Sequence, residues 1–119
     1  METPEEAFKR QYIILCQEFA GGMAAKMGEI DSGLASLRAA ADADAARDAL
    51  KTIEAAAHRL AGGGSTFGFP QIGRAAVPLD SRARKLGREP APSAAAAGEL
   101  APLADTLRAL IADPGEPQI

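Results

Sequence analysis

The chain has little of several residue types that carry chemistry: one histidine, one cysteine, one tyrosine and no tryptophan. The single Cys16 excludes an intramolecular disulfide, and no cysteine and histidine stand at the spacing of a metal site, so we expect no metal and a reducing compartment. No run of about 18 apolar residues occurs, and the basic start of a signal peptide is missing. We therefore expect a cytoplasmic protein without a membrane partner.

Excess charge of either sign is also lacking. Sixteen acidic and thirteen basic residues give a formal charge of -3, and no cluster of basic residues stands ready for a phosphate backbone. Nucleic acid is therefore excluded as an expected partner. The 119 residues suffice for one domain, residues 1–119, but leave no room for an added ATP-binding kinase domain. We expect a protein that is not an enzyme in its own right.

Helix-forming residues dominate the rest of the composition, and β-branched residues are scarce, which favours an all-α fold. Apolar residues recur every three or four positions in four stretches, each predicting an amphipathic helix. The predicted helices cover roughly 4–39, 43–63, 69–86 and 94–112. Because the connections between them are short, neighbours must run in opposite directions, and the sequence predicts an antiparallel up-down-up-down four-helix bundle.

Several residues mark the ends and weak points of these helices. Asp42 or Asp44 can cap the second helix, which we expect to fray at the glycines 62–64. Pro70 suits a first helical turn, whereas Pro78 predicts either a kink or a shorter third helix. The tail from Asp113 onward is expected to fray.

The only histidine, His58, lies on the second predicted helix, about 130° from the centre of its apolar face at 100° of rotation per residue. It therefore faces solvent. An imidazole with an unperturbed pKa near 6.5 is largely neutral at physiological pH and can act as a nucleophile. The alternative is an ordinary solvated side chain. On the same side of the helix lie small or polar residues, with Ala61 at the margin: Lys51, Ala55, Gly62 and Ser65.

The segment from His58 to Phe69, His-Arg-Leu-Ala-Gly-Gly-Gly-Ser-Thr-Phe-Gly-Phe, resembles the signature of histidine phosphotransfer domains. That signature is written H-x-L-K-G, with a further glycine ten residues after the histidine. His58, Leu60, Gly62 and Gly68 match it. The string is most similar to the phosphotransfer domain of chemotaxis-type histidine kinases.

The resemblance implies roles for three of these residues. His58 would be the phosphorylated residue, Gly62 would let a partner approach, and Gly68 would end the turn into the next helix. Asp80 falls where chemotaxis-type members often carry a glutamate that hydrogen-bonds the histidine ring. For Asp80, a solvated surface carboxylate is the other interpretation.

One position departs from the signature. The family usually has a lysine three residues after the histidine, and this chain has Ala61. Arg59, Lys51 and Arg74 are the candidate substitutes for the missing cation. Arg59 is turned about 100° from His58 and Lys51 is about two helical turns away, so Arg74 would have to arrive from the third helix.

The resemblance thus implies a carrier in a two-component phosphorelay, with a histidine kinase or hybrid kinase and a response-regulator receiver domain as partners. We expect a monomer with no cofactor of its own, the Mg²⁺ being held by the partner. The alternative is a docking module that binds the same partners without phosphorylation. Metal or haem binding lacks a second ligand, and a hydrolase lacks a nucleophile with its base.

Overall fold

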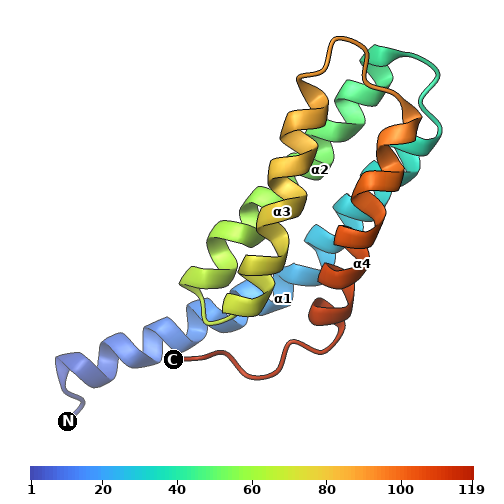
Figure 1. Ribbon diagram of the computed structural model, residues 1–119. Coiled ribbons are helices and arrows are strands. Elements are labelled where there is room, and N and C mark those ends of the chain that lie inside the picture. The colour runs from blue at the N-terminus through green and yellow to red at the C-terminus, as the bar shows by residue number, and fades with distance from the viewer.

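The structure is a computed structural model that describes all residues 1–119, and every regular element in it is helical. The elements are α1 (Pro4–Arg38), α2 (Ala43–Thr66), α3 (Pro70–Gly87), the short 3₁₀ helix η1 (Ala94–Ala96) and α4 (Ala97–Ala112). Consecutive helices run in opposite directions and lie side by side (Figure 1). The expected all-α, four-helix bundle is confirmed. No helix is long and apolar enough to cross a membrane.

The helices begin where the sequence offers caps or proline. The Thr3 hydroxyl accepts a hydrogen bond from the Glu6 amide, and Pro4 occupies the first turn of α1. Asp42, rather than Asp44, caps α2 by accepting a hydrogen bond of 2.8 Å from the Ala45 amide. Pro70 opens α3. These local signals fix the lengths of the connections and therefore the antiparallel order.

The core is one apolar cluster to which all four α-helices contribute. Each helix buries the stripe that its three-or-four spacing predicts, except that the stripe of α1 is buried only from Cys16 onward and Phe8 is 71% exposed. The largest fully buried side chains are Met23, Ile30, Leu37, Leu50, Ile53, Leu60, Leu79, Leu100, Leu107 and Cys16. Since Cys16 is buried in this stripe, it serves as a small apolar side chain.

The three consecutive glycines lie inside α2, which continues to Thr66 instead of fraying at 62–64 as expected. A Cβ atom on Gly63 would lie within 2.2 Å of the Phe19 ring, and one on Gly64 would lie 2.6 Å from the Gly73 amide nitrogen of α3. Gly63 and Gly64 are therefore packing positions, where α1 and α3 approach the backbone of α2 closely, whereas Gly62 faces open space.

Pro78 lies within α3, which runs unbroken from Pro70 to Gly87, so the alternative of a shorter third helix is wrong. Proline removes the amide that would pair with the carbonyl of Arg74. Both residues are exposed, and water can satisfy that carbonyl oxygen. The third helix therefore keeps its full length beside α2.

The two chain ends meet at one end of the bundle. The first turns of α1 project past the other helices (Figure 1), and Tyr12 donates a hydrogen bond of 2.5 Å to the Thr66 carbonyl at the end of α2. The tail after α4 crosses beneath the bundle, where the Gln118 amide donates to the Gly68 carbonyl at 2.7 Å. As expected, residues 113–119 lie outside any helix, and this hydrogen bond ties the tail to the α2–α3 turn.

Candidate functional site

His58 stands in the middle of α2, on the side away from the core, with 70% of its side chain exposed. Ala57, one residue before it, and Leu60, two residues after it, are fully buried and hold that orientation. Ala55 and Gly62, on either side of His58 along the same face, are exposed. The ring is accordingly open to a macromolecule that approaches along α2.

Asp80 on α3 faces the histidine. Its carboxylate oxygen Oδ2 lies 2.9 Å from His58 Nδ1, although the aspartate side chain is only 10% exposed. The shorter aspartate therefore reaches the ring from its place between α2 and α3. Because an ionised carboxylate only accepts hydrogen bonds, this contact favours the tautomer of the neutral ring that has its proton on Nδ1 and its lone pair on the exposed Nε2.

Arg84, one turn after Asp80 on α3, completes this arrangement. Its guanidinium donates to the second Asp80 oxygen at 2.9 Å and to Glu54 of α2 at 3.0 Å. The hydrogen bond to Glu54, followed by the charge of Asp80, raises the pKa of Arg84 above its ordinary value. Asp80 thus has each oxygen held by a different partner, and its plane is fixed relative to the imidazole.

Comparison with models of protein families identifies the family of this chain. The model of the Hpt domain matches residues 15–113, which include the whole bundle apart from the first turns of α1. The chain belongs to the Hpt domain family. Comparison with curated proteins and with solved structures gives no match. The resemblance to histidine phosphotransfer domains is therefore confirmed, while the likeness to the chemotaxis-type members stays a prediction.

Hpt domains are phosphotransfer modules of two-component signalling that interact with kinases and response regulators, and they carry no ATP-binding domain of their own. An Hpt domain needs an accessible histidine and little else, since the transition state of phosphoryl transfer is loose and depends on alignment and charge. The His58 side of α2 meets this requirement: the ring is exposed and its orientation is held by Asp80.

The candidate substitutes for the missing lysine do not join the Asp80 network. Arg59, Lys51 and Arg74 are all exposed, and none of them makes an ion pair. Ala61 is half-buried and offers no charge. The cation that the structure brings into the network is Arg84, which sequence reasoning missed.

Two signals in the sequence point to Arg84 in retrospect. It follows Asp80 by four residues, the spacing at which a carboxylate and a guanidinium meet on one helix. Glu54 precedes His58 by four residues, so it lies on the adjoining turn of α2. Neither pair indicates by itself that both join one network, because their meeting depends on the packing of α2 against α3.

The remaining predicted residues lie toward the α2–α3 turn. Ser65 is exposed, and its hydroxyl oxygen would lie 2.8 Å from a Cβ on Gly73, so it borders the close crossing of the two helices. Gly68 is buried with φ of 91°, a backbone conformation that other residues rarely adopt. It therefore allows the tight passage into α3.

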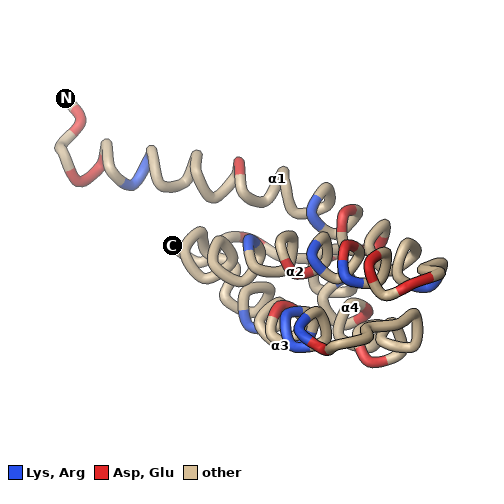
Figure 2. Tube along the Cα trace, turned by 90° about the horizontal axis from the view of Figure 1, so that it is seen from above, with Lys and Arg blue, Asp and Glu red and all other residues tan.

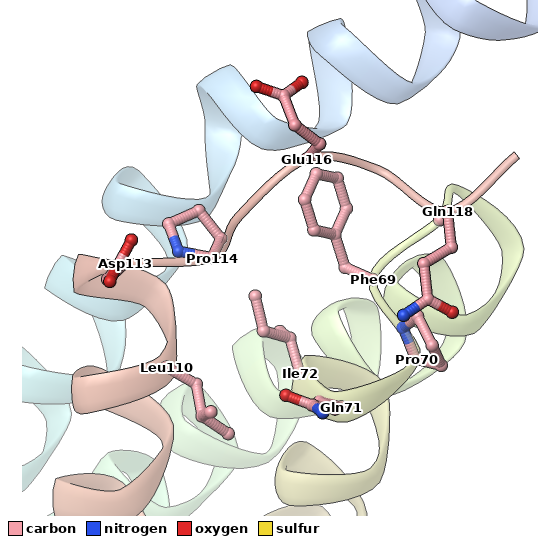
Figure 3. Close-up of a pocket in the computed structure, with 10 residues that line it drawn as sticks. Phe69, Pro70, Gln71, Ile72, Leu110, Asp113, Pro114, Glu116 and Gln118 are labelled. Carbon is pink, nitrogen blue, oxygen red and sulfur yellow. The ribbon is translucent and has the colours of Figure 1, made fainter.

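The C-terminal tail covers this turn. In Figure 3, the side chains of Phe69, Ile72 and Leu110 point toward the space beneath it, and Gln118 lies beside Pro70. The hollow between the tail and the turn has a volume of only about 40 Å³. Pockets for small molecules usually have several hundred Å³, so this hollow is a packing defect at the end of the bundle and not a ligand site.

Proposed function

We propose that His58 is the residue of this Hpt domain that carries the phosphoryl group, between a histidine kinase or hybrid kinase and a response-regulator receiver domain. The observation that carries the proposal is the 2.9 Å contact between His58 Nδ1 and Asp80, combined with the 70% exposure of the histidine side chain. One nitrogen is held by a carboxylate, which leaves the other for chemistry.

In the proposed step, the lone pair of His58 Nε2 attacks the phosphorus of a phospho-aspartate on the donor. The bond between phosphorus and the donor's carboxylate oxygen breaks, and that carboxylate leaves with the electron pair. The Nδ1 proton stays in place, so the ring becomes positive, and the adjacent Asp80 carboxylate stabilises this charge. The same bonds form and break in reverse when a receiver aspartate takes the phosphoryl group.

The partner supplies what this chain lacks. We propose that no cofactor belongs to the chain itself and that Mg²⁺ is held by the carboxylates of the receiver or kinase domain, the ligands that this ion prefers. The chain contributes the nucleophile, its orientation and an open surface. It is therefore a covalent intermediate in a relay rather than an enzyme that turns over alone.

The test is phosphorylation of the purified chain by a panel of phosphorylated receiver domains and autophosphorylating kinases. We expect acid-labile label on the wild type with at least one donor and none on His58→Gln, whose side chain is similar in size but is not a phosphoryl acceptor. Lys26→Gln serves as a matched surface control and should label like the wild type. Label that persists on His58→Gln would contradict the proposal.

A second function is favoured by one observation, the alanine at position 61. Without a lysine there, the chain is a candidate for a docking module that binds the same signalling partners without being phosphorylated. Under that alternative, His58→Gln keeps both partner binding and signalling output, and no competent donor labels the wild type. Loss of output in His58→Gln with binding retained would exclude it.

Three further expectations belong to this proposal. Residues 1–119 would act as one unit, in which the part of α1 before the family match extends the first helix. The unit would work in the cytoplasm, where kinases and receivers exchange phosphoryl groups, and it would work as a monomer. Sedimentation at several concentrations tests the last of these, since a dimer would raise the apparent mass as concentration increases.

A further inference from the structure

Charge is distributed unevenly along the chain. Residues 51–88, which include most of α2 and all of α3, contain seven basic residues and only two acidic ones. The rest of the chain contains six basic and fourteen acidic residues. The segment 51–88, which contains His58 and Asp80, is therefore net positive although the chain as a whole is negative. No basic run is visible in the sequence, because the basic residues are spread over nearly forty positions.

The basic residues of this region are also the ones left unpaired. Seven lysines and arginines of the chain form no ion pair, and five of them lie between 51 and 88: Lys51, Arg59, Arg74, Lys85 and Arg88. All five are exposed. The two carboxylates of the region, Glu54 and Asp80, are both bound by Arg84. The nearest carboxylates without an ion pair, Asp48 and Glu89, lie just outside the region, beside Lys51 and Arg88.

The fold places Lys85 in a groove between α3 and α4, where it lies beside Leu103, and leaves the other four cations on the exposed sides of α2 and α3. Lys51 lies seven residues before His58, nearly two full helical turns, and so projects from the same side of α2. Arg88 follows Arg84 by one turn on α3, and Figure 2 shows basic positions recurring along this helix. We call Lys51, Arg59, Arg74 and Arg88, together with the surface they surround, the basic face.

The centre of the basic face is small and apolar. Ala55 and Gly62 are exposed beside His58, and a Cβ atom on Gly62 would meet nothing within 4 Å. Val77 of α3 is 51% exposed, an unusual state for a large aliphatic side chain on a helix that buries its other ones. An apolar centre with a charged rim is the common composition of a protein–protein docking surface.

We propose that the basic face binds a protein whose docking surface is acidic and that its unpaired cations steer this partner toward His58. The inference rests on the proposed function and narrows it, because it states the charge of the partner. A domain that holds Mg²⁺ beside an acceptor aspartate has clustered carboxylates at that point, and such a surface complements the basic face.

The experiment compares two double variants with the same change in net charge. Lys51→Glu with Arg74→Glu reverses charge within the basic face. Lys9→Glu with Arg38→Glu reverses two cations on α1 that are also exposed and unpaired. Circular dichroism establishes that both variants fold. Transfer is then measured with a phosphorylated receiver domain that labels the wild type, across a series of sodium chloride concentrations.

We expect the second-order rate of transfer to the wild type to fall steeply with salt, and the basic-face variant to be slower by about 10-fold or more at low salt, the range of electrostatic steering. At saturating receiver concentration its rate should approach that of the wild type. The α1 variant should stay within about twofold, since its charges lie outside the docking surface. Equal rates for the two variants, or salt-independent transfer to the wild type, would overturn the proposal.

Failure of the proposed function gives a different result from failure of this inference. If no donor labels the wild type, binding of the unphosphorylated receiver domains is followed by fluorescence anisotropy over the same salt series. Salt-sensitive binding that the basic-face variant loses would then support the basic face alone. Binding of the wild type to anionic lipid vesicles or to nucleic acid, with no receiver bound, would assign these cations to another class of partner and contradict it.

Discussion

The helix pairs α2–α3 and α1–α4 are each joined by an arginine that binds two carboxylates. They differ in the other groups that these carboxylates contact. In each pair an arginine bridges two carboxylates: Arg84 binds Glu54 and Asp80, while Arg108 of α4 binds Asp31 of α1 and Asp105. In both cases hydrogen bonds to the carboxylates raise the pKa of the arginine. The two bridges join neighbouring helices in the same way.

The difference lies in the burial of the carboxylates and in the histidine. The Asp80 side chain is 10% exposed and holds His58, whereas the Asp31 side chain is 45% exposed and holds no titratable group besides Arg108. An exposed ion pair contributes little to stability because solvent screens it. The Arg84 bridge thus differs from the Arg108 bridge because its carboxylate Asp80 also orients the imidazole of His58.

Substitution of Asp80 is expected to change the phosphorylation rate more than any other variant described below. Asp80→Asn removes the negative charge beside Nδ1 while keeping the shape, so the positive charge on phosphorylated His58 loses its partner. We expect the phosphorylation rate to fall by about 10- to 100-fold, the cost found when a group that orients a metal-binding histidine is removed. Asp31→Asn should leave the rate unchanged. Phosphorylation time courses of both variants with one donor decide the matter, and equal rates would refute the role of Asp80.

The next effect concerns how closely the helices of the site pair approach. Gly64→Ala places a Cβ atom 2.6 Å from the Gly73 amide nitrogen, and backbone cannot move aside cheaply. We expect a loss of about 1–3 kcal/mol in the free energy of unfolding, typical of overpacking. Gly62→Ala meets nothing within 4 Å and should be neutral or slightly stabilising. Urea unfolding measures both, and equal stability of the two variants would mean that α2 and α3 are not in this close contact.

Substitution of Arg84 and of Arg108 separates the roles of the two bridges in phosphoryl transfer. Arg84→Met frees one Asp80 oxygen and lets the carboxylate rotate, so transfer should slow by a few-fold, on the order of one hydrogen bond to a charged group. Arg108→Met should leave transfer unchanged and reduce stability by at most about 1 kcal/mol, because its bridge is exposed. A matching loss of transfer in Arg108→Met would show that the effect is one of folding. Nitrogen-15 shifts of the His58 ring provide a second readout, which a purely structural role of Arg84 would leave unmoved.

The smallest effect is a dependence of stability on alkaline pH outside both bridges. Partial desolvation, followed by a contact with Cys16, raises the pKa of Tyr12 above 10.0. The unfolded chain therefore loses the tyrosine proton first, and stability that is present below pH 10 declines as the pH rises beyond it. Both arginines remain charged over this range. Thermal unfolding between pH 8 and 11 should show a decline for the wild type that is smaller for Tyr12→Phe; an unchanged decline would assign it to another group.

Much of this architecture can be predicted from the sequence because it is local or periodic. The caps at Thr3 and Asp42, the proline at position 70 and the apolar stripes determine where helices begin and which sides are buried. The exposed position of His58 follows from the same rotation of 100° per residue. These features depend on neighbours along the chain, which the sequence displays directly.

The features that could not be predicted from the sequence depend on contacts between helices. The glycines 62–64 have the composition of a helix end, and only the approach of Phe19 and Gly73 explains why the helix continues through them. For Asp80 the sequence left two interpretations open, a contact with the histidine ring and a solvated carboxylate, and the packing of α2 against α3 produces the contact. The role of Arg84 could not be predicted because it depends on the packing of α3 against α2, which brings Glu54 to the arginine that already binds Asp80.

In the proposed function, Asp80 holds Nδ1 of His58 and Nε2 carries the phosphoryl group. The most direct test is nuclear magnetic resonance of the chain labelled with nitrogen-15 in its only histidine, before and after phosphorylation. We expect a proton on Nδ1 in both states and a phosphorus coupling to Nε2 in the phosphorylated state. Phosphorus coupled to Nδ1, or an Nε2 that is protonated in the free protein while Nδ1 is bare, would contradict it.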